Sequence, residues 1–291
     1  MDISPAEIDE VVRIALLEDR ADADITTETL VPADLRGAAR IIAKAEGVLA
    51  GVEVAGAVFR AVDPSLKFNR ILVDGARLEV AGDAEAHGTI AELSGSVMSI
   101  LKGERVALNF LQHLSGIATE TSRYVQEVAD YDAVILDTRK TAPGLRDLQK
   151  YAVAVGGGTN HRRDLSDGVL IKDNHIAAGR LNELSLGGVV RKVRESAPVA
   201  WEVEVEVETM EQLREAVEAG ADIVMLDNMT LSEMAEVVRV VDGRALTEAS
   251  GGITLDNVRE VAATGVDRIS VGALTHSVTG LDINLELLDM G

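Results

Sequence analysis

From residue 133 onward, short apolar runs alternate with helical segments, and polar residues directly follow most of the runs. The six runs are Ala133–Leu136, Gly168–Ile171, Val203–Val207, Ile223–Leu226, Ala245–Leu246 and Ile269–Val271. Because neighbouring parallel strands need a long crossover, which is usually a helix, this alternation predicts a parallel sheet. Polar residues at the carboxyl ends of strands are typical of a β/α barrel, whose active site lies on that face. Six strands, where a full barrel has eight, predict an incomplete barrel.

A doubly wound open sheet is the alternative for this region, because it also binds ligands at the carboxyl ends of its strands. We favour the barrel. The sequence contains neither a GxxxxGK[ST] motif nor a GxGxxG motif placed after a strand. Their absence argues against an NTPase and against a Rossmann oxidoreductase.

The amino-terminal part of the chain has a different pattern. Ser4 to Glu7 form a capping box with proline after the cap, which predicts a helix start. Short strand-like pieces follow at Ala38–Ala43, Leu72–Val73 and Leu78–Val80, with glycine turns between them. Apolar spacing then becomes helical from Ser99 to Ala129. We therefore place a domain boundary near residue 110.

Composition narrows the possible partners and chemistry. The chain has 28 Lys and Arg against 49 Asp and Glu, a net charge of −21, so we expect neither nucleic acid nor a membrane as a partner. Cysteine is absent, which excludes disulfides, thiolate zinc sites and a cysteine nucleophile. No apolar stretch is long enough for a membrane span or a signal peptide, so we expect a cytoplasmic protein.

Residues 139–172 carry the opposite charge, with seven basic and three acidic residues and a net charge of +4. The basic residues are Arg139, Lys140, Arg146, Lys150, Arg162, Arg163 and Lys172. Because Arg139, Lys140 and Lys172 follow predicted strands, we interpret the cluster as an anion site, with His161 as a further donor. A solvated face held by salt bridges is the alternative.

Glutamate alternates with valine over residues 202–208. Alternation places the glutamates on one face of a strand, and a valine face against the surrounding helices would turn them toward the barrel interior. Glu206 and Asp227 would then lie near the carboxyl ends of two neighbouring strands, as ligands for sugar hydroxyls or a hydrated Mg²⁺. The alternative is an exposed edge strand.

Glycines follow the last two predicted strands, in Ser250–Gly252 and in Gly272–Ala273. Such turns present backbone N–H groups to a phosphate, and barrels commonly bind phosphate after their last two strands. A glycine pair on its own is more often a simple turn.

Several of these motifs together resemble the quinolinate phosphoribosyltransferases, and the likeness covers essentially the whole chain. The motifs lie at residues 109–119, 137–146, 160–162, 171–175, 204–207, 226–228, 250–252 and 271–277. The resemblance implies an amino-terminal α/β sandwich domain over residues 1–110, joined by residues 277–291, and a partial β/α barrel over residues 111–276. It also implies an enzyme that joins quinolinate to phosphoribosyl pyrophosphate with Mg²⁺, giving nicotinate mononucleotide, pyrophosphate and CO₂ in NAD biosynthesis.

The resemblance further assigns roles to individual residues. Arg139 and Arg162 would meet the quinolinate carboxylates, with Lys172 and His161 nearby. Arg105 would enter the site of a neighbouring subunit, which implies at least a homodimer. The remaining substrate-binding residues would be Thr138, Lys140, Glu206, Asp227, Ser250, Gly251, Gly252, Val271, Gly272 and Ala273. Those implied as catalytic are Lys140, Lys172, Glu206 and Asp227, the last two also holding the metal.

Two other functions are weighed against this one. The first is a phosphoribosyltransferase that acts on nicotinate or another base without decarboxylation, although a monocarboxylate needs only one of the paired arginines. The second is a barrel that binds an anion without turnover, in which the interior carboxylates would be dispensable.

Overall fold

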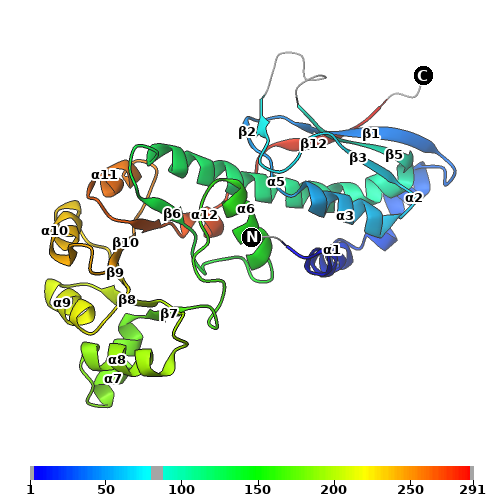
Figure 1. Cartoon of the computed structure of the whole chain (residues 1–291). Helices are drawn as coiled ribbons and strands as arrows, with labels where there is room; N and C mark the ends of the chain where they lie inside the picture. Colours follow the sequence, from blue (N-terminus) through cyan, green and yellow to red (C-terminus); the bar gives the residue numbers. More distant parts are fainter. Residues whose placement is uncertain (1–2, 80–87, 289–291) are drawn as a thin grey trace. The chain divides into compact units, whose positions relative to one another are not determined.

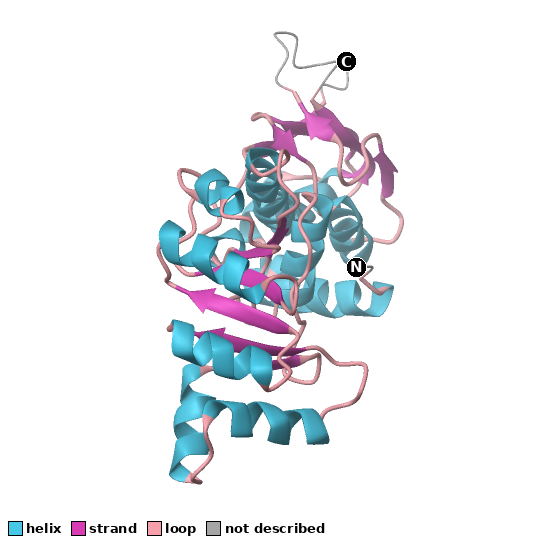
Figure 2. Ribbon diagram, turned by 60° about the vertical axis from the view of Figure 1, so that its left-hand side comes forward, coloured by secondary structure: helices cyan, strands magenta, loops and turns pink. Residues whose placement is uncertain are grey.

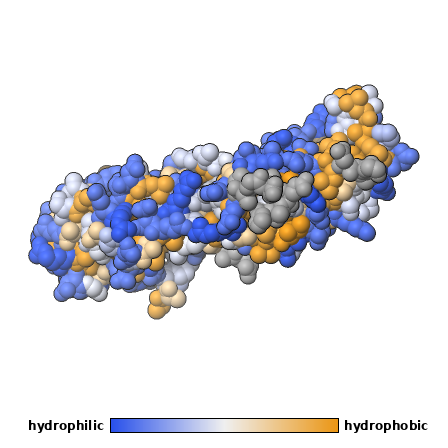
Figure 3. All heavy atoms as spheres, turned by 90° about the horizontal axis from the view of Figure 1, so that it is seen from above, coloured by the Kyte–Doolittle hydropathy of each residue, from blue (hydrophilic) through white to orange (hydrophobic). Residues whose placement is uncertain are grey.

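The computed structural model describes residues 3–79 and 88–288, and it divides the chain into two compact units (Figure 1). Unit 1 comprises Met1–Ser122, Thr141–Gly157 and Leu274–Gly291, and unit 2 comprises Arg123–Lys140 and Gly158–Ala273. No helix in the described ranges is long and apolar enough to cross a membrane. The surface in Figure 3 is mostly hydrophilic, with scattered hydrophobic residues.

Unit 1 contains a four-stranded antiparallel sheet in the order β12-β1-β5-β3. Its strands are β1 (Arg36–Ala43), β3 (Lys67–Arg70), β5 (Thr89–Ser96) and β12 (Ile283–Leu287), and β2 (Gly47–Val48) pairs separately with β4 (Arg77–Leu78). Its helices are α1 (Pro5–Asp19), η1 (Ala21–Ala23), α2 (Ile25–Leu30), α3 (Val52–Val62) and α6 (Arg146–Val155), together with most of α5 (Val97–Glu127). The strand from the chain's end completes this sheet beside β1.

The local predictions for unit 1 met different outcomes. Helix α1 begins as expected, because the Ser4 side chain accepts from the Glu7 N–H and the Glu7 carboxylate accepts from the Ser4 N–H. The strand predicted at Ala38–Ala43 is β1. Leu72–Val73 form no strand and belong to an irregular segment, and Val80 lies outside the described residues.

The long helix α5 explains why a boundary is hard to read from the sequence. The boundary that we predicted near residue 110 falls inside α5 and stays a prediction; the two compact units divide between Ser122 and Arg123 of the same helix. The apolar face of α5 is buried along its length, for example at Leu111, Leu114 and Ile117. Helical periodicity therefore continues past residue 110 without interruption.

Unit 2 is built on a six-stranded parallel sheet in the order β6-β11-β10-β9-β8-β7. The strands are β6 (Val134–Leu136), β7 (Val169–Ile171), β8 (Val203–Val207), β9 (Ile223–Asp227), β10 (Leu246–Ser250) and β11 (Arg268–Ser270). The helices between them are α7 (Asp173–Leu181), α8 (Leu186–Ser196), α9 (Met210–Glu218), α10 (Leu231–Val241) and α11 (Val258–Ala263), and α12 (Ala273–His276) follows β11. Figure 2 shows the helices packed along these strands.

The strand order confirms the incomplete barrel. From β7 to β11 the order advances in one direction, and β6 then pairs with β11 as the first strand of a barrel pairs with the last. The ring is open between β6 and β7. A doubly wound sheet would reverse its order at a switch point, and this sheet does not. Helices α8, α9, α10 and α11 contact one another in sequence on one side of the sheet (Figure 1).

Strand β8 shows why the barrel interior carries charge. Its three valines are fully buried, and β8 packs against α8 and α9. On the opposite face, Glu204 and Glu206 are also buried, and β8 lies between β7 and β9 and not at an edge. The predicted interior glutamate face is therefore present, and these carboxylates need partners inside the barrel.

Candidate active site

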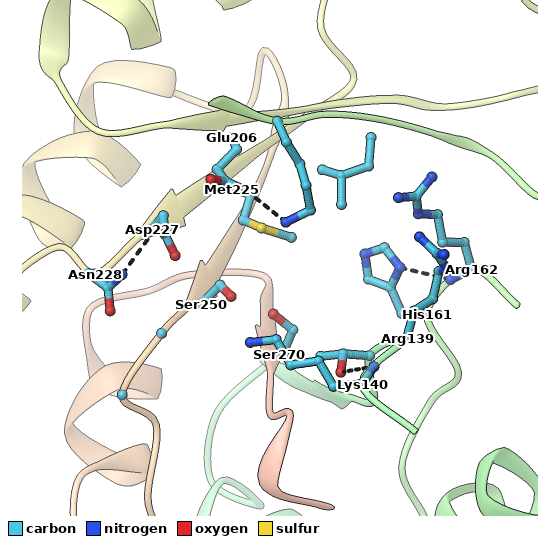
Figure 4. Close-up of a pocket in the computed structure, with 15 residues that line it drawn as sticks. Arg139, Lys140, His161, Arg162, Glu206, Met225, Asp227, Asn228, Ser250 and Ser270 are labelled. Carbon is cyan, nitrogen blue, oxygen red and sulfur yellow. Dashed lines mark hydrogen bonds and ion pairs between the residues drawn. The ribbon is translucent and has the colours of Figure 1, made fainter. Parts of the chain in front are cut away.

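A cavity of about 640 Å³ opens at the carboxyl ends of the strands of unit 2 (Figure 4). The lining residues are Thr138, Arg139, Lys140, His161, Arg162, Leu170, Lys172, Glu206, Met225, Asp227, Asn228, Ser250, Gly251, Gly252 and Ser270. All the substrate-binding residues predicted between Thr138 and Gly252 lie in this cavity. Together with Ser270 of β11, they lie at or just after the ends of all six strands, because parallel strands bring their carboxyl ends to one face.

Asp137 organises the arginine side of the cavity. Its side chain is fully buried, where Oδ2 accepts from Nδ2 of Asn160 at 2.7 Å and Oδ1 accepts from the N–H of His161 at 2.9 Å. The N–H of Thr159 donates to the carbonyl of Ile135 at 2.8 Å. These bonds hold residues 159–161 against the end of β6, so Arg162 lies beside Arg139.

The two arginines are placed to receive an anion. Burial lowers the pKa of Arg162, and the neighbouring charge of Arg139 lowers it further. Nε of Arg139 is buried and has no hydrogen-bond partner among the described residues. A buried guanidinium donor without an acceptor, beside a second guanidinium, fits a bound carboxylate or phosphate.

Two carboxylates lie on the opposite side of the cavity. The register pairs Glu206 of β8 with Met225 of β9, so Asp227 lies two residues further along on the same face. Oε2 of Glu206 accepts from Nζ of Lys172 at 2.9 Å, and Oδ2 of Asp227 accepts from Nδ2 of Asn228 at 3.0 Å. Mg²⁺ keeps several waters and uses only one or two carboxylates, so this oxygen pair fits a hydrated magnesium ion.

The turn after β10 brings backbone close to the cavity. Gly251 and Gly252 have φ values of +90° and +62°, which a residue with a side chain rarely adopts. A Cβ atom on Gly251 would collide with the Asn228 side chain. The backbone N–H of Asn228 donates to the carbonyl of Ser250 at 3.0 Å. The turn is therefore tied to the end of β9, and only glycine fits at its centre.

Four predicted residues lie elsewhere. Val271 is buried, and Gly272 and Ala273 lead into α12; they follow Ser270 but do not line the cavity, so their contact with phosphate stays a prediction. Arg105 lies on α5 in unit 1 with 59% of its side chain exposed, and it forms an ion pair with Glu104 at 3.9 Å. Its predicted role involves a second subunit, which a single chain does not test.

The sequence reasoning missed four lining residues, which are Leu170, Met225, Asn228 and Ser270. Leu170 and Met225 each precede a predicted site residue by two positions on a strand, and Ser270 precedes Gly272 in the same way. Because side chains alternate along a strand, residues two apart point to the same face. That rule could have found these three.

A second layer of charged residues lies beneath the cavity. Nε2 of His161 lies 3.0 Å from Oε2 of Glu204 and 3.6 Å from Oε1 of Glu248. Glu248 is fully buried on β10, and burial, followed by the charge of Glu204, raises its pKa to about 7. Glu204 and Glu248 precede Glu206 and Ser250 by two positions on their strands, so the same alternation places them here.

Comparisons with known proteins agree along the chain. The family model for the quinolinate phosphoribosyltransferase amino-terminal domain matches residues 24–115, and the model for the carboxyl-terminal domain matches residues 117–286. The "probable nicotinate-nucleotide pyrophosphorylase (carboxylating)" of Bacillus subtilis is 44% identical over 272 residues, covering 93% of this chain and 90% of that protein.

Solved structures give the same result. The nicotinate-nucleotide pyrophosphorylase of Francisella tularensis superposes with a TM-score of 0.91 at 37% identity, covering 99% of this chain and 98% of that one. NadC of Streptococcus pyogenes superposes with a TM-score of 0.90 at 41% identity, covering 99% and 100%. With both domain models matched in order, the chain belongs to the quinolinate phosphoribosyltransferase family.

Proposed function

We propose that the chain transfers the phosphoribosyl group of phosphoribosyl pyrophosphate to quinolinate and releases pyrophosphate and CO₂, giving nicotinate mononucleotide for NAD biosynthesis. Family membership supports this reaction. The single structural observation that carries it is the facing arrangement in Figure 4, where Arg139 and Arg162 lie across the cavity from Glu206 and Asp227. Quinolinate is a dianion and the ribosyl centre becomes cationic, so the substrates need these two opposite linings.

The arginine side would hold quinolinate. Arg139 and Arg162 offer one guanidinium for each carboxylate, and His161 and Lys172, the latter bound to Glu206, also line the cavity. A monocarboxylate such as nicotinate would leave one buried guanidinium without its anion. This asymmetry favours the dicarboxylate as the substrate.

The carboxylate side would hold phosphoribosyl pyrophosphate. Glu206 and Asp227 would hold Mg²⁺ through oxygen atoms or its water shell, and the bound ion would neutralise charge on the leaving pyrophosphate. Lys140 and Thr138 lie at the end of β6, and Ser250 to Gly252 at the end of β10. Their cationic and N–H groups suit the phosphates.

The same linings account for the chemistry without a nucleophilic side chain. As pyrophosphate leaves, the anomeric carbon gains positive charge, which Glu206 and Asp227 stabilise electrostatically. The ring nitrogen of quinolinate forms the new bond to that carbon and becomes a pyridinium. The positive charge of the pyridinium then stabilises the electron pair that stays on the adjacent ring carbon as its carboxylate leaves as CO₂, and this carbon takes up a proton from the solvent, so the step needs mainly positioning.

A homodimer would complete the site. Arg105 is exposed on α5, and its nearest acidic partner, Glu104, is 3.9 Å away. From a second copy, this guanidinium would add a further positive charge to the cavity for the anionic substrates.

The direct test follows both products from one incubation. The protein is mixed with carboxyl-labelled quinolinate, phosphoribosyl pyrophosphate and Mg²⁺, and a parallel reaction contains nicotinate in place of quinolinate. We expect equal amounts of CO₂ and nicotinate mononucleotide from quinolinate and no product from nicotinate. Product from nicotinate without CO₂ would contradict the decarboxylating assignment. Binding of quinolinate with no product in either tube would indicate an anion-binding protein.

A further inference from the structure

The proposed reaction leaves a buried acidic cluster unexplained. His161, Glu204 and Glu248 each offer a ligand atom, and these three atoms lie within 4.8 Å of one another. Glu248 is 0% exposed and Glu204 is 3% exposed. Among the described residues, no hydrogen-bond partner reaches Oε1 of Glu204 or either carboxyl oxygen of Glu248. Buried oxygens without donors require a cation or a proton.

The tautomer of His161 argues for a proton. The N–H of Arg162 donates to Nδ1 of His161 at 2.8 Å, so Nδ1 carries a lone pair and the ring hydrogen is on Nε2. Nε2 is the atom that faces Glu204 and Glu248. A ring nitrogen that carries hydrogen has no lone pair for a metal, so the cluster is not arranged as a metal site.

Charge balance then points to Glu248. A neutral imidazole leaves two buried carboxylates together, and two such groups do not both ionise at close range. Oε2 of Glu204 lies 3.0 Å from Nε2 of His161, and Glu204 also interacts with the charge of Arg162. Among the described residues no donor reaches either carboxyl oxygen of Glu248, and a proton on Glu248 would remove the repulsion between the two carboxylates.

The other elements packed against Glu248 do not replace this proton. His161, and then the Ser270 hydroxyl and Arg268 of β11, act to lower the pKa of Glu248, and burial together with the charge of Glu204 outweighs them. The register places Met225 of β9, which is uncharged, beside Glu248. The pKa of about 7 that results lies where small changes of nearby charge alter protonation.

The cluster is in contact with the substrate cavity. His161 lines the cavity and also touches Glu248, and Ser270 lines the cavity from the neighbouring strand. We propose that Glu248 takes up one proton when a dianion binds in the cavity. Glu248 thereby acts as a positioning residue for quinolinate. The identity of the dianion rests on the proposed function; the coupling rests on the cluster.

The sign of the effect follows from linkage. An anion in the cavity disfavours a charge on Glu248 and raises its pKa further, so the complex holds more protons than the free protein. The affinity for the dianion is therefore highest below about pH 7 and falls as the pH rises above that value. Two charges near Glu248 in a partly hydrated cavity should weaken binding about tenfold between about pH 6.5 and 8.5. Both carboxyls of quinolinate stay ionised over this range.

Titration calorimetry of the whole chain with quinolinate alone tests the coupling. Each titration is run in two phosphate-free buffers that differ in ionisation enthalpy, so that the proton uptake is counted directly. The wild type should take up about half a proton or more near pH 7.5 and lose affinity as the pH rises. Glu248→Gln, which keeps the shape without the titrating group, should bind with an affinity independent of pH. Glu236→Gln, an exposed change on α10, should behave as the wild type.

The outcomes separate the coupling from the proposed function. Binding of quinolinate by the wild type with no proton uptake would overturn the coupling and leave the proposed function intact. A full pH dependence retained in Glu248→Gln would overturn the assignment to Glu248. Failure of quinolinate to bind at any pH would remove the proposed function and the coupling together. If Glu248→Gln does not fold, the wild-type proton count near pH 7.5 decides.

Discussion

Arg139 and Arg162 lie beside one another, and the buried Nε of Arg139 has no hydrogen-bond partner in the described part of the chain. If each guanidinium holds one quinolinate carboxylate, removing either one deletes a charge-assisted pair worth about 2–3 kcal/mol. We therefore expect Arg139→Ala and Arg162→Ala to raise the KM for quinolinate about 30- to 160-fold. The KM for phosphoribosyl pyrophosphate should change much less, and steady-state kinetics with each substrate varied separately measures both.

Arg163→Ala is the matched control for these variants. Arg163 is the next residue in the chain, is exposed and does not line the cavity. It should leave both KM values near those of the wild type. Equal increases in both KM values for Arg139→Ala or Arg162→Ala would contradict the assignment of the pair to the carboxylates.

At the residue scale, the sequence predicts the side chains that line the cavity better than the buried charged residues beneath it. Lys172 directly follows an apolar run and Lys140 belongs to the polar segment after another, and the carboxyl ends of parallel strands meet, so their convergence follows from the topology. Glu248 sits between a threonine and an alanine in a strand of mixed polarity, and nothing in that pattern distinguishes it. Its role depends on Glu204 and His161, which are distant in the sequence.

Among the elements, the turn after β10 makes the sharpest demand on one residue type. Gly251 has φ of +90°, and any Cβ there would meet the Asn228 side chain. Gly251→Ala should therefore displace the turn and raise the KM for phosphoribosyl pyrophosphate about tenfold or more, since N–H groups aimed at a phosphate lose their direction. Steady-state kinetics with phosphoribosyl pyrophosphate varied measures this effect, and the KM for quinolinate should be less affected.

Gly243→Ala separates backbone strain from the loss of the binding turn. Gly243 also has a positive φ, +71°, but it precedes β10, lies outside the cavity, and has open space where a Cβ would stand. Both variants should be destabilised by about 1–2 kcal/mol through strain. Only Gly251→Ala should raise the KM for phosphoribosyl pyrophosphate. Similar kinetics for the two variants would argue against a phosphate-binding role for this turn.

Element type could be predicted in unit 2 because its apolar runs are short and separated by helical segments, of which α8, α9 and α10 each begin at a capping side chain. The six strands confirm this pattern. Unit 1 was harder because its sheet pairs residues from both ends of the chain, such as Ala39 of β1 with Leu287 of β12. Likewise, residues 141–157 group with unit 1 although both flanking segments belong to unit 2. The periodicity within one segment does not indicate which distant segment it pairs with.

The whole molecule carries a charge of −21 and is expected to bind two anionic substrates. The basic residues that oppose this charge in the cavity are Arg139, Lys140, Arg162 and Lys172, which all belong to unit 2. Arg105, by contrast, lies on α5 in unit 1, and its side chain is exposed. An exposed arginine contributes little as a surface ion pair, so its proposed use is in a second copy of the chain.

Mixing two inactive variants tests this assembly. Arg105→Ala should impair the site of the neighbouring subunit, whereas Lys172→Ala removes a lining residue from its own cavity. In a hybrid dimer one cavity carries both defects and the other carries neither. Random exchange of equal amounts gives hybrids as half of the dimers, so the mixture should regain about a quarter of wild-type activity per subunit.

Arg123→Ala in place of Arg105→Ala is the control, because Arg123 lies on the same helix in unit 2 and does not line the cavity. The Arg123→Ala variant alone should stay active. Subunit exchange is verified by native mass spectrometry. No recovery after verified exchange would mean that each site is complete within one chain.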